Sequence, residues 1–207
     1  MKHRPEDILD AAMRLFDAEG VGVSTSKVAK AAGVANGTLF NYFPSKQELI
    51  DALYVRLKTQ LGQALGDIDE TLPLRDQTKL IWDRWIAWGR ANPEARRVSR
   101  LLHESGLASP DAAASVDAAL AAPMGVLQRL GASGELADLP LDYIGAITQA
   151  HLELAVDVEL EPGPDGTHLA AFHDRAFEAM WNAIAVPSQL GPLAVRTDLN
   201  IPQETLT

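Results

Sequence analysis

The sequence contains no cysteine. This absence excludes a disulfide framework, a thiolate zinc site, a redox CxxC motif and a cysteine nucleophile. No stretch reaches the ~18 consecutive apolar residues of a membrane span. Residues 1–7 also lack the apolar core of a secretion signal. We therefore expect a cytoplasmic protein with no membrane partner.

Motifs of catalysis and of cofactor binding are missing as well. The pairs His103-Glu104 and His151-x-Glu153 suggest metal or acid/base chemistry, but no HExxH motif accompanies them. No G-x-S-x-G elbow, GxGxxG loop or P-loop is present. We therefore expect no enzymatic activity, no metal and no cofactor.

Alternating runs of β-branched residues are also absent, so the chain is predicted to be all-α. Its 207 residues are 47% hydrophobic and 22% charged, which is typical of a globular protein. Proline and glycine punctuation and good capping residues separate the helical stretches. Helices are predicted at about 5–19, 25–33, 37–43, 46–65, 73–91, 93–106, 110–131, 140–160 and 167–185. This order divides the chain into a three-helix head (1–47), a larger helical body (48–186) and an extended tail (187–207).

Acidic residues are absent between Gly20 and Gln47, although the whole chain has a net charge of −10. Residues 1–50 carry equal numbers of basic and acidic residues, and the acid-free window contains Lys27, Lys30 and Lys46. A local basic surface on an acidic protein confines attraction for a polyanion to one place. Chance clustering of three lysines is the alternative.

The segment 25–43 has the pattern of a helix-turn-helix. Two short helices that cross steeply need a small residue at the crossing and a turn residue that accepts positive φ. Ala29 and Gly33 meet these needs, and the expected inward apolar residues are Val28, Ala32, Val34, Leu39 and Tyr42. A purely structural helical hairpin could share the pattern, but it would not need to exclude acids or to present Ser, Thr, Asn and Lys outward. The segment therefore predicts binding to double-stranded DNA.

Residues 8–49 resemble the DNA-binding region of TetR-family transcriptional regulators. The resemblance is carried by Ala11-Ala12-x-x-Leu15-Phe16-x-x-x-Gly20, Val28-Ala29-x-x-Ala32-Gly33-Val34 and Gly37-Thr38-Leu39-Phe40-Asn41-Tyr42-Phe43-Pro44-Ser45-Lys46-x-x-Leu49. Asn36 departs from the pattern, because Lys, Arg or Pro is frequent there. The resemblance covers about the first quarter of the chain. It implies an Ω-shaped homodimer whose heads bind a palindromic operator and whose bodies bind a small-molecule effector.

Base-reading and phosphate-binding roles can be assigned separately within the head. The amides of Asn36 and Asn41 suit adenine, and the Thr38 methyl suits a thymine methyl. Phosphate contacts are better suited to hydroxyls, cations and helix N-termini. The predicted DNA-binding set is Thr25, Ser26, Lys27, Asn36, Gly37, Thr38, Asn41, Tyr42 and Lys46. Core packing is an alternative role for Tyr42, and Phe40 and Phe43 are expected in the core.

The body offers a candidate effector site. Trp82, Trp85 and Trp88 recur every three residues, and His151 lies on an apolar helical stripe. Aromatic stripes and lone histidines are most often core residues, but a mainly apolar pocket with few polar groups suits a hydrophobic or aromatic ligand. The predicted lining residues are Trp82, Trp85, His103, Met124, Leu127, His151 and Phe172.

The last two predicted helices have apolar residues on more than one side. Ile144, Ile147, Leu154 and Val158 form one stripe of 140–160, Leu152, Val156 and Leu160 lie near another, and 167–185 adds Phe177, Met180 and Trp181. We therefore expect a four-helix homodimer interface. Helix 45–65 joins head to body and is expected to act as a lever. Two alternatives stay open: activation in place of repression, and control by a protein partner in place of an effector.

Overall fold

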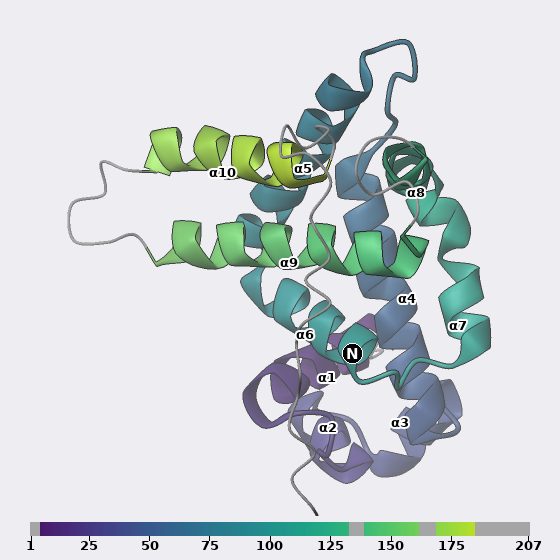
Figure 1. The fold of residues 1–207 in the computed structure, drawn as a ribbon. Coiled ribbons are helices and arrows are strands. Elements are labelled where there is room, and N and C mark those ends of the chain that lie inside the picture. Colours follow the sequence, from purple (N-terminus) through teal and green to yellow (C-terminus); the bar gives the residue numbers. More distant parts are fainter. Residues whose placement is uncertain (1–4, 133–138, 162–168, 185–207) are drawn as a thin grey trace, which may run out of the picture.

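The computed structural model describes residues 5–132, 139–161 and 169–184. Over these ranges it contains ten helices and no strand, which confirms the all-α prediction (Figure 1). The helices are α1 (Pro5–Glu19), α2 (Thr25–Ala31), α3 (Asn36–Tyr42), α4 (Lys46–Leu65), α5 (Leu74–Ala91), α6 (Pro93–Glu104), α7 (Pro110–Ser115), α8 (Asp117–Gly131), α9 (Leu141–Leu160) and α10 (Leu169–Ile184). None of the helices described is long and apolar enough to cross a membrane. The predicted tail lies outside the described residues.

Local chemistry explains the helix boundaries of the head. Gly20 has φ of 80° and ends α1 in a conformation that costs little only for glycine. The Ser24 hydroxyl accepts a hydrogen bond from the Lys27 amide at 3.3 Å, which caps α2. The Ser45 hydroxyl accepts from the Glu48 amide at 3.1 Å and caps α4. Serine side chains therefore determine where α2 and α4 begin.

The predicted helix 110–131 is wrong in one respect, because the chain breaks at Val116 into α7 and α8. The Ser115 hydroxyl donates to the Ala112 carbonyl at 2.7 Å, and such a bond competes with helix continuation. Within α8, Pro123 has no amide to donate to the Ala119 carbonyl. Gly62 of α4 faces that carbonyl, and a Cβ at position 62 would overlap it. This close approach positions α4 against α8.

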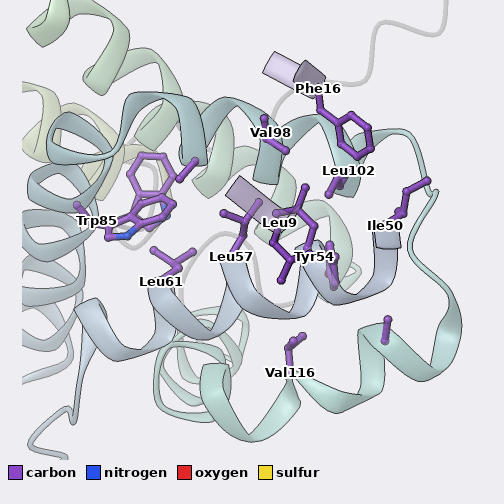
Figure 2. Close-up of a cluster of buried hydrophobic side chains, with 14 of the residues drawn as sticks. Leu9, Phe16, Ile50, Tyr54, Leu57, Leu61, Trp85, Val98, Leu102 and Val116 are labelled. Atoms are coloured by element: carbon purple, nitrogen blue, oxygen red, sulfur yellow. The ribbon is translucent and has the colours of Figure 1, made fainter. Parts of the chain in front are cut away.

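A buried apolar stripe along α4 joins head and body. Leu53, Leu57, Leu61 and Leu65 are all buried, as their spacing predicts. Figure 2 shows Leu57 and Leu61 of α4 in the same cluster as Leu9 and Phe16 of α1 and Val98 and Leu102 of α6. The core therefore continues across the predicted boundary after residue 47, and α1 is packed on the body as well as on the head.

Helices α9 and α10 lie side by side and project from the body (Figure 1). His173 of α10 fastens them to α5, since its Nδ1 lies 2.8 Å from Glu159 of α9 and its Nε2 lies 2.7 Å from Asp83 of α5. Burial by itself lowers the pKa of His173, but the hydrogen bonds to Asp83 and Glu159 outweigh burial and raise it above the ordinary value of 6.5. The nearby Lys79 ammonium acts in the lowering direction. Both ring nitrogens face carboxylates, so the clamp is complete only when the ring is protonated.

This clamp makes stability depend on pH. A raised folded-state pKa contributes stability that is fully present below the unfolded value of 6.5 and is lost as the pH rises through the folded value. The unfolding temperature is therefore expected to fall above pH 6.5, and His173→Gln should remove that part of the decline. Thermal unfolding from pH ~6 to ~9 measures it. His151→Gln is the matched control, because its Nδ1 lies 2.9 Å from the main-chain oxygen of Ile147 and not from a carboxylate. An unchanged decline in His173→Gln would contradict the assignment.

Candidate DNA-binding surface and ligand cavity

Helices α2 and α3 are held together by a small apolar crossing. Val28, Ala29 and Leu39 are buried, and Ala32 and Val34 pack against them. Gly33 between the helices has φ of 69°, and the Val34 amide donates to the Ala29 carbonyl at 2.9 Å. The predicted small residue, turn glycine and inward residues therefore lie where the helix-turn-helix pattern places them, apart from Tyr42.

The outer face of this pair carries the predicted DNA-binding residues. Six of the nine are exposed, namely Ser26, Lys27, Asn36, Gly37, Asn41 and Tyr42. Three others are half-buried, namely Thr25, Thr38 and Lys46. One surface thus brings together hydroxyls, amides and cations from α2, α3 and the start of α4.

The aromatic residues in and next to α3 differ from the prediction in which of them are buried. Phe43 is buried as predicted, but Phe40 is 38% exposed, so its expected core position is wrong. Leu39 of this seven-residue helix and Phe43, which directly follows the helix, are both buried, whereas Phe40 is turned about 100° away from Leu39. Tyr42 is 41% exposed and does not occupy the core.

An acid outside the acid-free window changes the charge of this surface. The Lys27 ammonium lies 2.6 Å from Glu19 at the end of α1, and both side chains are exposed. An exposed pair of this kind contributes little to stability. It does, however, hold Lys27 between α1 and α2, so a phosphate would have to compete with Glu19 for this cation. Counting charges within the window did not reveal this pair.

The body contains three adjoining hollows that share Lys58, His103 and Gln149 in their walls. The largest has a volume of about 690 Å³ and opens between α4, α6, α8 and α9. The second, about 240 Å³, lies between α4, α5, α8 and α9, and we call it the inner hollow because buried residues such as Leu65 and Trp85 form part of its wall. The largest is lined by Lys58, Arg100, His103, Glu104, Met124, Leu127, Leu141, Asp142, Gly145, Ala146, Gln149, Ala150 and Glu153. The second adds chiefly apolar side chains: Tyr54, Leu61, Leu65, Ile81, Trp85, Leu120, Pro123 and Leu152.

Four predicted effector residues line these hollows, namely Trp85, His103, Met124 and Leu127. Trp82, His151 and Phe172 line none of the three. Trp82 is buried elsewhere, with its ring centroid 5.9 Å from that of Phe177 in an edge-on arrangement. Three residues turn an α-helix by about 300°, so Trp82 and Trp85 are only about 60° apart on α5. They differ in what packs on them, because Trp82 contacts α10 through Phe177 while Trp85 lines the second hollow. His151 faces away because its position on α9 belongs to an outward stripe, and Phe172 lies on α10.

Sequence reasoning missed Lys58 and Gln149. A signal for Lys58 existed, because Tyr54, Lys58, Leu61 and Leu65 recur on one side of α4 and a lysine within an apolar stripe is unusual. Burial lowers the pKa of Lys58, and the negative charge of Glu153 opposes this effect. Burial and the Lys58 charge lower the pKa of His103, and the negative charge of Glu104 opposes them.

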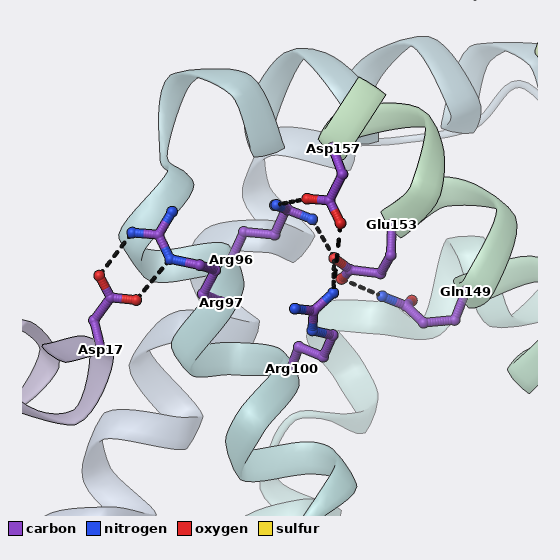
Figure 3. Close-up of polar contacts among 7 residues, drawn as sticks. All are labelled: Asp17, Arg96, Arg97, Arg100, Gln149, Glu153 and Asp157. Carbon is purple, nitrogen blue, oxygen red and sulfur yellow. Dashed lines mark hydrogen bonds and ion pairs between the residues drawn. The ribbon is translucent and has the colours of Figure 1, made fainter. Parts of the chain in front are cut away.

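Helix α6 carries arginines that connect the head to the cavity wall (Figure 3). Arg97 binds Asp17 of α1 through two hydrogen bonds of 2.7 Å each. Arg96 binds Glu153 and Asp157 of α9, and Arg100 binds Glu153 at 3.2 Å. Burial raises the pKa of the Glu153 carboxyl, while Arg96 and Arg100 act in the lowering direction. A single rigid helix therefore connects the end of α1 to the wall of the hollows.

Comparison with known proteins agrees with the architecture. Residues 8–53 match the family model for bacterial regulatory proteins of the tetR family. An uncharacterised HTH-type transcriptional regulator of Haemophilus influenzae is 36% identical over 90 residues, which are 42% of this chain and 48% of that protein. The nucleoid occlusion factor SlmA of Actinobacillus pleuropneumoniae is 32% identical over 101 residues, 47% of this chain and 50% of that protein. The chain thus spans about half the length of the curated relatives it matches.

Solved structures extend the likeness to the body. A TetR-family transcription regulator from Shewanella sp. PV-4 superposes with a TM-score of 0.75 at 28% identity. The match covers 88% of this chain and 98% of the Shewanella chain. The order of a helix-turn-helix head and a helical body is therefore shared with that protein over nearly its whole length.

Proposed function

We propose that this chain, which belongs to the TetR family of transcriptional regulators, is a repressor that binds a palindromic operator as a homodimer. It releases the operator when a small hydrophobic or aromatic molecule binds its body. The family consists of DNA-binding regulators and not of enzymes, in agreement with the missing catalytic motifs. The observation that carries the proposal is the exposed face of α2 and α3. It presents amides, hydroxyls and cations in an otherwise acidic protein.

Within this face, α3 is proposed to enter the major groove. Asn36 and Asn41 are exposed and carry amides that can pair with adenine, and the half-buried Thr38 can still present its methyl group. Lys46 begins α4, where its cation and the helix N-terminus both favour phosphate. Asn41 is therefore proposed to read sequence, and Lys46 is proposed to hold the head in position.

This division predicts different losses in two variants, measured on an operator selected from random DNA. Asn41→Ala should cost about 1–3 kcal/mol on the operator and relax the preference at one position per half-site. Lys46→Ala should weaken binding to all sequences alike and reduce the salt slope by about one per subunit. Fluorescence anisotropy on operator and scrambled DNA at several salt concentrations measures both. Equal losses of Asn41→Ala on both DNAs would refute its reading role.

A homodimer is proposed through the outer face of α9. Tyr143, Leu154 and Val158 are exposed, Ile147 is half-buried, and all four recur at helical spacing on one stripe. Leu154 is 64% exposed, and contiguous apolar surface of this kind marks an interaction site. Part of the expected interface has another role, because Ile144, Phe177 and Met180 are buried within this chain's own core.

Charge on this stripe should separate the protomers. Leu154→Glu is expected to give a monomer at micromolar concentration, since it would bury two like charges close to the two-fold axis. Leu72→Glu is the matched control, because Leu72 is also exposed but lies before α5, away from α9. Sedimentation velocity measures the mass of each. A wild-type monomer would refute the proposed homodimer, and a dimer that persists in Leu154→Glu would place the interface elsewhere.

Coupling between effector and operator is proposed to run through α4 and α6. Both helices line the hollows, α4 continues to the head through its buried stripe, and α6 holds α1 through Arg97. An effector that favours one arrangement of these helices changes the spacing of the two heads. A dimeric helix-turn-helix protein needs its heads about 34–36 Å apart to reach successive major grooves.

Linkage requires this coupling to be reciprocal. If an effector weakens operator affinity a hundredfold, a differential of about 2.7 kcal/mol, the operator must weaken effector affinity by the same factor. Calorimetry of the effector with and without operator tests this relation. Equal effector affinities would reject induction and favour control by a protein partner, and tighter operator binding with effector would indicate an activator or a corepressor.

A further inference from the structure

Lys58 is, with His103 and Gln149, one of the three residues common to the walls of all three hollows. It is half-buried, and no hydrogen bond or ion pair of its ammonium group is found among the residues that the structure describes. Its Nζ lies 5.7 Å from the centroid of the Tyr54 ring, a contact that favours a cation only modestly. Removing an ammonium from water without an anionic partner is unfavourable, in agreement with the lowered pKa of this group.

Acidic groups around Lys58 do not neutralise it. Glu153 is the nearby buried carboxylate, and it already accepts hydrogen bonds from Arg96, Arg100 and Gln149. Glu104 and Asp142 also line the largest hollow, but both are exposed and face water. The hollows thus contain a partly dehydrated positive charge at their junction.

The inner hollow supplies an apolar environment next to this charge. Leu61, Leu65 and Ile81 form part of its wall together with the Trp85 ring. Leu120 and Leu152 extend this apolar surface from α8 and α9. A ligand that reaches from Lys58 into this hollow must therefore be charged at one end and apolar along the rest.

We propose that the effector is an amphipathic organic acid, whose carboxylate binds the Lys58 ammonium and whose apolar chain or ring fills the inner hollow beside Trp85. Gln149 and His103 border the same point and can each donate a hydrogen bond to the second carboxylate oxygen. This inference rests on the proposed function only in assuming that the body binds a small effector. It narrows the proposed class of effector from hydrophobic or aromatic molecules in general to amphipathic organic acids.

Other ligand charges fit these hollows less well. An amine would bring a second cation against Lys58 in a partly dehydrated site, where like charges repel strongly. An alcohol of the same shape would fill the apolar hollow but leave the ammonium without an anion. The charge at the junction therefore selects between ligands that have the same tail.

Calorimetry with octanoate, octanol and octylamine tests this selection. Octanoate should bind at least tenfold more tightly than octanol, a difference of about 1.4 kcal/mol, and octylamine should bind most weakly. Lys58→Met keeps an unbranched side chain, one atom shorter, but removes its charge, and it should abolish the difference in affinity between octanoate and octanol. Lys58→Gln should do the same while keeping a polar group. Lys30→Met, an exposed lysine of the head, is the matched control and should retain the preference.

Stability in the absence of ligand gives a second readout. Because the half-buried ammonium has no anionic partner among the described residues, Lys58→Met should raise the unfolding temperature, by roughly 2–4 °C for each kcal/mol of relieved cost. Replacement of a lysine that forms a stabilising ion pair would instead lower the unfolding temperature. A lower unfolding temperature in both Lys58 variants would overturn the proposed state of this group.

The outcomes separate this inference from the proposed function. Octanoate that binds through Lys58 but leaves operator affinity unchanged would support the acid site and count against release by effector. Octanol that binds as tightly as octanoate, or an acid preference that persists in Lys58→Met, would overturn the acid site and leave effector control intact. Failure of all three probes to bind at millimolar concentration would also overturn it.

Discussion

The buried apolar stripe of α4 is the constraint on which the remaining structure depends. Leu53, Leu57, Leu61 and Leu65 lie on one side of a 20-residue helix, with the head packed at its start and the body along the rest. Burial of such side chains contributes roughly 1.5–3 kcal/mol each, so the stripe cannot slide without a large loss. Movement at either end of α4 must therefore be accommodated by the helices packed against it. Because of this rigidity, α4 holds the DNA-binding surface and the cavity in fixed positions relative to each other.

The ion pairs of the head and of the body differ in their burial. On the head, the paired Lys27 and Glu19 are exposed to water, so replacing Glu19 by a phosphate as the partner of Lys27 costs little free energy. In the body, Arg96 and Glu153 are both buried, and removal of either partner would leave an isolated charge in the core. The buried Arg96–Glu153 pair fastens α6 to α9. The exposed Lys27–Glu19 pair leaves Lys27 able to exchange Glu19 for a phosphate. Lys58 is the exception, because it is withdrawn from water but lacks a carboxylate partner in the described structure.

Local signals made the helices and the face of the head predictable. Gly20, Gly33 and Ser45 act within one turn of chain, so their effects can be read from neighbouring residues. The exposure of Asn41 follows from helical periodicity together with the buried Leu39. Periodicity alone was insufficient for Phe40, because a seven-residue helix has one narrow buried side and hydrophobic character does not guarantee a place on it. It also could not show the break at Val116, which depends on a side-chain hydrogen bond.

The sequence by itself determined the all-helical class, the helix-turn-helix and the polar character of its outer face, because each depends on residues fewer than about 20 apart. Only the tertiary structure decided which side chains meet across the fold. Asp17 and Arg97 are 80 residues apart, and His173 binds partners on two other helices. The walls of the hollows come from four or more helices, so the separation of Trp82 from Trp85 and the position of Lys58 depend on how those helices cross. Helix crossing is set by packing between distant segments, and no local pattern encodes it.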